Sequence, residues 1–477
     1  MDDKPFLEGD ALGEERRFWS HCAKSGALLC SFFLEICLAR PILLWYDIGR
    51  REGRNGLVEK RIIGIEEKVP LGQGIALSLQ HVFAMFGASV LVPIIFGVNP
   101  GIVLLMNGVG TLLFIFLTKG RSPAYLGSSF AFLAPAQVII SSMGYEYAQG
   151  GFVVVGLAGC ALALLIAKVG TDWIDIVLPP AAMGPIVALI GLELAANTVA
   201  GGPTGANLMS ETTAVGDWVV FLVTIGVAVL GSVLFRGFLS VIPLLVAMLC
   251  GYGTACLFGQ VSFEAVASAK LFQMPTFQLP KFDMQAILIM LPVLLVITSE
   301  HIGHQLVTGK IVGRDLIKDP GLHRSMLGDD LSTALSGMIG AVPTTTYGEN
   351  IGVMAITGVY SVYVIAGAAV ISMLMAFIGP LSALIQTIPG NVIGGISFLL
   401  YGMIGTSGIR LIVDARVDYG KSRNLILTSV VFVAGLSKLA IGVGGLQISG
   451  MTLACVVGMV LSLIFYVCDK MGIMEDK

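Results

Sequence analysis

Charged side chains are scarce in this chain of 477 residues: Asp, Glu, Lys and Arg make up 12% of it, whereas 56% of the residues are hydrophobic. An ordinary soluble domain has about 25% charged residues, so this chain would expose too much apolar surface to water. The composition excludes a soluble globule and predicts an all-α bundle in lipid. The 60 glycines agree, because transmembrane helices use glycine where two backbones approach closely.

Metal-binding and catalytic motifs are also missing. The eight cysteines have no paired metal-ligand spacing, and several lie inside apolar runs, where a thiol behaves as a small hydrophobic group. Only five histidines are present and no HExxH motif occurs, so we expect no metal site and no cofactor. The absence of a nucleophile–base set argues against a membrane enzyme, which is one alternative function. No basic stripe suggests a nucleic-acid partner.

Apolar windows of about 20 residues, the length that crosses a bilayer, predict fourteen membrane-spanning segments. A more polar stretch at 259–283 divides them into two sets of seven. The first set lies near 75–97, 101–118, 124–141, 151–168, 173–196, 216–235 and 238–258. The second set lies near 284–306, 327–342, 344–361, 362–381, 388–405, 424–442 and 448–467.

The basic residues of the loops predict the orientation, because Lys and Arg concentrate on the cytoplasmic side. Fourteen crossings that start inside place all the basic loops on one side, near 119–121, 168, 236, 310–324 and 410–423. We therefore expect a multi-pass protein of the cell membrane with both termini in the cytoplasm.

Residues 1–70 form an N-terminal extension outside this pattern. Their apolar stretch 27–45 is interrupted by Glu35, Arg40 and Pro41, which favours a helix in the membrane interface. The alternative, a further crossing, would place the N-terminus outside. No clear cleavage site follows the stretch, so a secretory signal is not expected.

Seven segments per half predict an inverted repeat, since an odd number of crossings reverses the orientation of the second half. A weak echo in the sequence agrees, because Gln80-His81 in the first segment corresponds to Glu300-His301 in the eighth. The halves cover 71–258 and 284–467.

The third and tenth segments are interrupted by small and polar residues, at Gly127-Ser128-Ser129 and at 343–348. Both predict short extended breaks. Non-helical backbone at membrane depth is tolerated only where protein buries it or where it lines a cavity. Each half-helix that follows offers unpaired N–H groups and a positive dipole end. The breaks therefore predict a substrate site, although they could also serve only close helix packing.

Two glutamates, Glu300 and Glu349, lie inside predicted spans. A charged side chain there costs roughly 2.5 to 3.5 kcal/mol on insertion scales, so a function must offset the cost. Carboxylates could accept hydrogen bonds from ring N–H groups of a substrate, and at least one of them could change its protonation during transport. The alternative is that each caps a helix or stays protonated in a packed bundle.

Three histidines accompany these acids. His304 lies about one helical turn after Glu300, so it could exchange a proton with the site or simply pack in the bundle. His301 is expected to be a packing residue. Gln80 and His81 are expected to form hydrogen bonds between helices.

Four stretches of sequence resemble the nucleobase-ascorbate transporters, especially the bacterial uracil and xanthine permease branch. The similarity extends over about residues 70–467. Its most specific piece is the signature Glu349-Asn350-Ile351-Gly352 followed by Thr357-Gly358. The stretches are QHVFAMFGASVLVP at 80–93, YLGSSFAFLAP at 125–135, SEHIGH at 299–304 and TTYGENIGVMAITGVYS at 345–361.

The resemblance implies a transporter with a core domain, spans 1–4 and 8–11, that moves against a gate domain, spans 5–7 and 12–14. It also implies a homodimer in the lipid bilayer and symport of a nucleobase with a proton. Carried over by position, Glu300 and Glu349 would hold the base and His304 would belong to the proton-coupling network. The other residues implied at the substrate are Phe130, Ala88, Tyr347, Gly348 and, from the gate side, Tyr401.

The identity of the base is left open by two residues. Glu349 resembles uracil carriers, because xanthine and urate carriers usually have Gln at this place. Gly358 differs from the Arg of the uracil branch and resembles some purine carriers. Uracil is therefore the first expectation and xanthine the second. An anion carrier of the sulfate-permease type is a further alternative, which two glutamates in the site disfavour.

Overall fold

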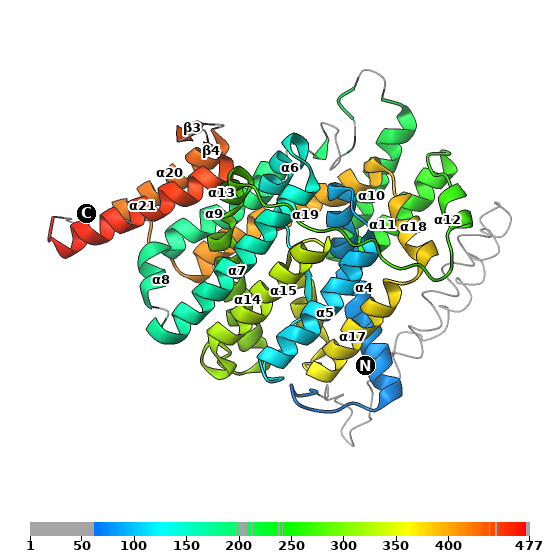
Figure 1. Ribbon diagram of the computed structural model, residues 1–477, viewed down its shortest axis with the longest axis horizontal. Coiled ribbons are helices and arrows are strands. Elements are labelled where there is room, and N and C mark those ends of the chain that lie inside the picture. The colour runs from blue at the N-terminus through cyan, green and yellow to red at the C-terminus, as the bar shows by residue number, and fades with distance from the viewer. Residues whose placement is uncertain are drawn as a thin grey trace, which may run out of the picture. The chain divides into compact units, whose positions relative to one another are not determined.

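Apolar helices make up most of the chain that the structure describes, as the composition predicts (Figure 1). The computed structural model describes residues 62–473 apart from 171, 196–197, 200–205, 207, 211–212, 237–238, 241, 438 and 444–445. The predicted interfacial helix at 27–45 lies outside the described residues.

Helices occupy the predicted spans of the first half, with an extended break in the third. The elements are α4 (Leu71–Phe96), α5 (Pro100–Leu117), β1 (Leu126–Ser128), α6 (Leu133–Ser142), α7 (Tyr145–Val169), α8 (Asp172–Val177), α9 (Pro180–Ala195), α10 (Val215–Leu234) and α11 (Pro243–Leu257). The polar stretch that follows contains one short helix, α12 (Glu264–Ser268).

The second half is also mostly helical and contains an extended break, β2, in its third predicted span. Its elements are α13 (Met284–Met290), α14 (Val293–Val312), η5 (Ile317–Gly321), α15 (Leu322–Ile339), β2 (Thr344–Thr346), α16 (Gly348–Thr357), α17 (Val362–Met375), α18 (Gly379–Gln386), α19 (Gly390–Asp414), α20 (Ser422–Leu436), β3 (Ala440–Val443), β4 (Leu446–Ser449) and α21 (Gly450–Lys470).

Some helix boundaries differ from the predicted spans. The span predicted at 173–196 divides at Pro179-Pro180 into α8 and α9, since proline cannot continue a helical hydrogen-bond ladder. The span predicted at 362–381 ends at Met375, and a new helix starts at Gly379 with Pro380 in its first turn.

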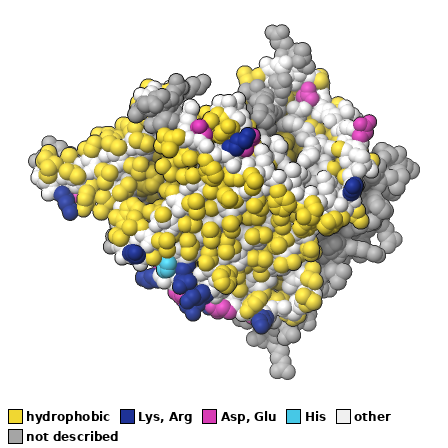
Figure 2. All heavy atoms as spheres, viewed as in Figure 1, with side chains coloured by type: hydrophobic (Ala, Val, Ile, Leu, Met, Phe, Trp, Pro, Cys, Tyr) yellow, Lys and Arg dark blue, Asp and Glu magenta, His cyan; other side chains and the backbone are white. Residues whose placement is uncertain are grey.

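Seven of the described helices are long and apolar enough to cross a membrane, and five further apolar helices are shorter. The face in Figure 2 carries a broad hydrophobic area with Lys and Arg side chains around its margins. Exposed side chains such as Leu222, Leu230 and Val233 on α10 belong in lipid rather than water. The described chain is a mostly helical, multi-pass membrane protein.

Glycines let neighbouring helices approach closely in two places. In Figure 1, α15 runs beside both α7 and α5, and α14 contacts α7 and α15. A Cβ atom on Gly156 of α7 would lie 2.6 Å from the backbone nitrogen of Ala334 on α15. A second close pair, α9 and α19, meets at Gly408, where a Cβ atom would contact the α9 backbone. Small residues at such crossings are typical of helix packing in membranes.

The strands β1 and β2 pair with each other in antiparallel register, Leu126 with Thr346 and Ser128 with Thr344. The pair is extended at both ends, because the Ser129 N–H donates to Pro343 O at 2.8 Å and the Tyr347 N–H donates to Tyr125 O at 2.9 Å. Backbone groups that would be unpaired in two separate breaks are thus satisfied by each other.

A threonine on a neighbouring helix holds the first residue of each strand. Thr111 on α5 accepts from the Leu126 N–H at 2.9 Å. Thr333 on α15 accepts from the Thr344 N–H at 3.1 Å and donates to the Thr344 carbonyl at 2.8 Å. The same device therefore occurs once in each half.

We expect Thr333→Val to destabilise the protein by about 1 to 3 kcal/mol, because the buried Thr344 N–H and C=O lose a partner while the side-chain volume is kept. Thermal unfolding in detergent measures the effect. Thr298→Val is the matched control, since among the described residues that buried hydroxyl bonds only to Leu294 of its own helix. Equal melting temperatures for the two variants would contradict this role of Thr333.

The segment before α4 is tied to the loop after α14 by an exposed ion pair. Arg314 donates two hydrogen bonds, of 2.7 and 2.9 Å, to the Glu66 carboxylate. This guanidinium holds the pKa of Glu66 below its ordinary value. The stabilisation from a lowered carboxyl pKa is present at neutral pH and is lost as the pH falls through that pKa, below about 4.3.

We expect Glu66→Gln to cost less than about 1 kcal/mol at pH 7, because both partners are about half exposed. The difference in melting temperature from the parent should shrink toward zero below about pH 4. A difference that grows at acidic pH would show that the ion pair does not cause it.

Candidate functional site

The candidate site lies where β1 and β2 pair, with the half-helices α6 and α16 following them and α14 beside them. At the start of α16 the Ile351 N–H bonds to Tyr347 O at 3.3 Å. The N–H groups of residues 348–350 precede that bond, so no backbone carbonyl of α16 accepts from them. They present donors and the positive end of the helix dipole to the site.

Three predicted substrate residues come together in one cluster. Ala88 on α4 and Tyr347 are both buried in it, and Phe130 packs against it while remaining partly exposed. The Tyr347 ring lies over Gly127 of β1, where a Cβ atom would collide with ring carbons. Tyr347 also accepts a hydrogen bond of 3.4 Å from Ser89 on α4. An aromatic ring and a small side chain thus line one side of the site.

Gly348 and His304 lie next to each other on α16 and α14. His304 Nδ1 is 2.9 Å from the Thr346 hydroxyl of β2. A Cβ atom on Gly348 would have His304 Nε2 as its nearest neighbour, at 3.6 Å, with nothing else within 4 Å. Gly348 is exposed as well. The backbone at the start of α16 is therefore exposed, with His304 of α14 as its nearest neighbour across the helices.

The two glutamates lie on α14 and α16, two helices that pack against each other. Glu300 on α14 is within range of electrostatic interaction with Glu349 in the first turn of α16. The Glu300 Oε2 atom is buried and has no hydrogen-bond partner among the described residues. Glu349 is partly exposed. A buried carboxylate oxygen without a donor is costly, so it calls for a donor that the described chain itself does not supply.

The signature residues Asn350 and Thr357 form hydrogen bonds at the two ends of α16. Asn350 donates to His81 Nδ1 at 3.1 Å and to the His81 carbonyl at 3.2 Å, which links α16 to α4 as the sequence predicts for His81. Gln80 is buried beside it on α4. Thr357 donates to Val353 O at 2.8 Å near the end of α16.

Gly358 ends helix α16. Its φ of 71° is in the left-handed region, which glycine adopts without strain. Its carbonyl accepts from the Ile63 N–H at 2.9 Å. Gly358 thus has a backbone role that is independent of the transported base, which weakens it as an indicator of a purine.

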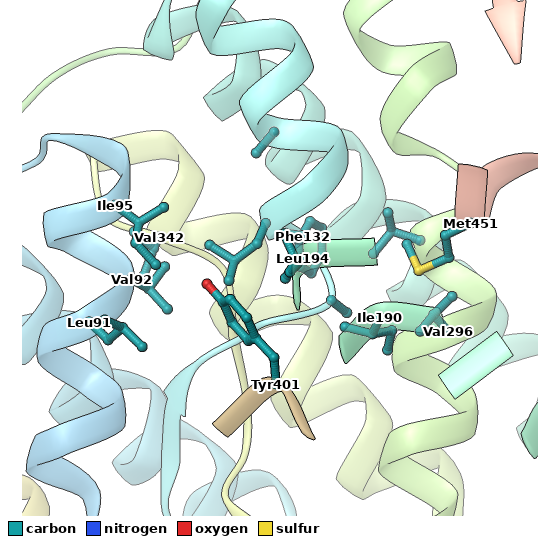
Figure 3. Close-up of a cluster of buried hydrophobic side chains, with 14 of the residues drawn as sticks. Leu91, Val92, Ile95, Phe132, Ile190, Leu194, Val296, Val342, Tyr401 and Met451 are labelled. Atoms are coloured by element: carbon teal, nitrogen blue, oxygen red, sulfur yellow. The ribbon is translucent and has the colours of Figure 1, made fainter. Parts of the chain in front are cut away.

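Tyr401 lies in a neighbouring apolar cluster rather than in the cluster of Ala88 and Tyr347. In Figure 3 its ring projects from α19, with the hydroxyl directed toward the side of α4 that carries Leu91 and Val92. Phe130 packs against both clusters and connects the two. The Tyr401 hydroxyl is buried without a hydrogen-bond partner among the described residues.

Sequence reasoning missed a buried polar group beside Glu300. His301 Nδ1 is 2.8 Å from Asp329 Oδ2, and His301 Nε2 is 2.9 Å from the Ser325 hydroxyl. All three side chains are buried between α14 and α15. The available signal was the adjacent pair Asp329-Asp330 inside an apolar segment, because an intramembrane acid is a functional candidate by default.

The sequence also did not predict a short chain of hydrogen bonds that ends at the Tyr347 hydroxyl. Asn107 on α5 donates to the Ser89 hydroxyl at 3.1 Å, and Ser89 in turn donates to Tyr347. Asn107 and Ser89 are single polar residues in apolar helices, a weak pattern that packing alone also produces. Across the described residues, no group of three or more His, Cys, Asp or Glu side chains could hold a metal ion.

Comparison with known proteins gives a consistent family. Residues 72–444 match the model described as the permease family. The uracil permease of Paenibacillus larvae subsp. larvae is 51% identical over 423 residues, which cover 87% of this chain and 99% of that protein. The uracil permease of Escherichia coli strain K12 is 52% identical over 407 residues, 85% of this chain and 94% of that protein.

Solved structures share the fold at low sequence identity. Murine Slc26a9, an anion transporter in the inward-facing state, has a TM-score of 0.64 and 10% identity over 90% of this chain and 75% of its own. The transmembrane domain of the cyanobacterial bicarbonate transporter BicA has a TM-score of 0.53 and 17% identity over 84% of this chain and 99% of its own. The sequence relatives are permeases rather than enzymes, and the chain belongs to the permease family of nucleobase-ascorbate transporters that its motifs resemble.

Proposed function

We propose that this chain carries uracil across the cell membrane together with a proton. The observation that carries the proposal is the buried Glu300 Oε2 atom without a partner among the described residues, on the helix that packs against the exposed start of α16. The relatives named uracil permeases, at 46 to 52% identity, support uracil as the substrate.

The chemistry of the site suits a pyrimidine edge. Uracil has ring N–H donors and carbonyl acceptors in one plane. Glu300 and Glu349 accept from the N–H groups, and the unpaired N–H groups at the start of α16 donate to a carbonyl. Phe130 contacts the face of the ring, and Ala88 leaves room for it. Tyr401 closes the site from the gate domain, because it moves with α19.

Proton coupling follows from the same carboxyl groups. Two carboxylates close together in a low-dielectric site repel each other, so an empty site favours a proton on one of them. His304 lies one turn after Glu300 and bonds to Thr346, and in this proposal it passes the proton between the site and solvent.

The proposed architecture is fourteen spans in two inverted halves. The matching threonine devices at Thr111 and Thr333, and the pairing of β1 with β2, support the inverted repeat. The packing of α4, α5, α15 and α17 against one another, and of α9, α10, α19 and α20, supports a core and a gate domain. We further propose that the carrier is a homodimer with both termini in the cytoplasm.

Xanthine is the second candidate, on the ground of Gly358 alone. Competition decides between the two: purified protein in liposomes takes up radiolabelled uracil while xanthine, uric acid, thymine or ascorbate is added in excess. Inhibition by uracil and thymine but not by xanthine supports the proposal. Strong inhibition by xanthine would make the chain a purine carrier, and the absence of uptake of any base, with uptake of sulfate, would make it an anion carrier.

A further inference from the structure

The hydrogen bonds of the buried group Asp329–His301–Ser325 show how many protons the group carries. A serine hydroxyl has one donor, a neutral imidazole has one, and a carboxylate has none. The Ser325 hydroxyl lies 2.9 Å from His301 Nε2 and 3.0 Å from the Leu322 carbonyl. It can therefore donate in either of two directions.

When Ser325 donates to His301 Nε2, the imidazole must carry its proton on Nδ1 and donate it to the Asp329 carboxylate, at 2.8 Å. The group then has a net charge of minus one. When Ser325 donates to the Leu322 carbonyl, His301 Nε2 must carry a proton and donate it to the Ser325 oxygen. A further proton is then needed between Nδ1 and Asp329 Oδ2, and the group is neutral.

Both ring nitrogens of His301 are hydrogen-bonded in both arrangements, and the two differ by one proton and by whether the Ser325 hydroxyl donates to Leu322. A purely structural buried ion pair has one arrangement, and removal of its proton leaves a group unsatisfied. Here the rotation of one hydroxyl keeps the His301 ring bonded to Asp329 Oδ2 and to Ser325 before and after the change, while Asp329 Oδ1 has no partner among the described residues in either arrangement. We propose that the Asp329–His301–Ser325 group is the place where the co-transported proton is held while the base occupies the site.

The surroundings give the group a proton donor. Glu300 precedes His301 on α14, interacts electrostatically with Asp329 and has the unpartnered Oε2 atom. When the base binds, Glu300 must be ionised to accept from a ring N–H. Its O–H bond breaks, a bond from the same proton to His301 or Asp329 forms, and the total charge of the region does not change.

Among the described residues, the ion-pair partner of Asp329 is His301. Arg324, which precedes Ser325 on α15, donates to the Leu117 carbonyl of α5 at 3.4 Å. Several ionisable groups on the surrounding elements interact electrostatically with Asp329 or His301, or with one another. They are Glu300 and His304 on α14, Asp330 on α15, Glu349 on α16 and Cys160 on α7. Helix α5 has no ionisable side chain and contributes the ring of Phe114, whose centre lies 6.3 Å from that of His301.

This inference rests on proton symport, the proposed function. Its test uses the full-length protein in liposomes with three measurements: equilibrium binding of uracil, exchange of labelled for unlabelled uracil at equal pH, and accumulation of uracil with proton uptake under an inward pH gradient. If the parent protein exchanges uracil but does not respond to the gradient, the symport proposal fails first, independently of Asp329.

For Asp329→Asn we expect uracil binding to stay within about threefold of the parent, because Asp329 does not touch the base. Exchange persists, whereas accumulation above equilibrium and proton uptake per uracil are lost. Accumulation and proton uptake equal to the parent would overturn the inference. Loss of exchange with intact binding would also overturn it, since the pair would then only hold the helices together.

Ser325→Ala gives an independent test if Asp329→Asn does not fold. It keeps both ionisable groups but removes the hydroxyl that rotates, so we expect the pH profile of accumulation to shift by about one unit. Ser336→Ala on the same helix is the matched control, because the Ser336 hydroxyl is buried without a partner among the described residues. Identical profiles for the two serine variants would overturn the inference.

Discussion

Glu300→Gln should lower the affinity for uracil roughly 10- to 150-fold, the equivalent of one hydrogen bond to a charged group. The Glu300 Oε2 atom is a buried acceptor without a partner among the described residues, and the proposal assigns it a ring N–H of the base. An amide of the same size accepts with one atom only and carries no charge. Binding of labelled uracil to the purified variant measures the loss.

The same variant should also lose its response to pH, because an amide does not exchange a proton in this range. Residual uptake by Glu300→Gln is expected to be the same with and without an inward pH gradient. Glu193→Gln is the matched control: this glutamate also lies in an apolar helix, but it accepts from the Met451 N–H at 3.1 Å, a bond that an amide oxygen keeps. Parent-like affinity and coupling in Glu300→Gln would refute the assigned role.

Gly127→Ala should reduce uracil uptake at least about tenfold, because the added methyl group displaces the Tyr347 ring. The added methyl group would occupy the place of Tyr347 ring carbons, and rotation of that ring would break its contact with Ser89. Overpacking of a tight core typically costs about 1 to 3 kcal/mol, so the ring or the strand must move. Gly127 lies in β1, so the shift reaches the strand pair itself.

Uptake and thermal unfolding together separate the site effect from general instability. Gly64→Ala is the control, since nothing lies within 4 Å of a Cβ atom at that non-helical glycine. We expect Gly127→Ala to unfold at a lower temperature and to lose uptake even at temperatures where it remains folded. Normal uptake by the folded variant would show that the Tyr347 ring is not required at its present place.

The sequence predicted the helical segments and the two breaks well because each depends on local properties. Hydropathy over about 20 residues identifies a span, and the runs at 127–129 and 343–348 interrupt it with residues that favour extended backbone. Both breaks coincide with the strands β1 and β2. The divisions at Pro179-Pro180 and before Pro380 were also readable in principle, since proline ends helices.

The pairing of side chains across helices was much less predictable. Asp329 and His301 meet because α14 and α15 cross at a particular angle, and no local pattern encodes that angle. Similarly, the position of Tyr401 depends on how α19 packs against α9, α10 and α11. The predicted cluster of Ala88, Phe130 and Tyr347 came from the resemblance to a family and not from periodicity.

The pairing of β1 with β2 has a consequence for the synthesis and membrane insertion of the protein. Leu126 leaves the ribosome long before its partner Thr346. At about 5 to 20 residues per second, the chain between them takes roughly 10 to 40 s to synthesise. During this interval the partner strand does not yet exist, so the backbone groups of the first strand need another partner, such as water or an insertion factor, if that strand enters the membrane. A chain truncated before residue 344 would therefore enter the membrane as helices but never assemble the site.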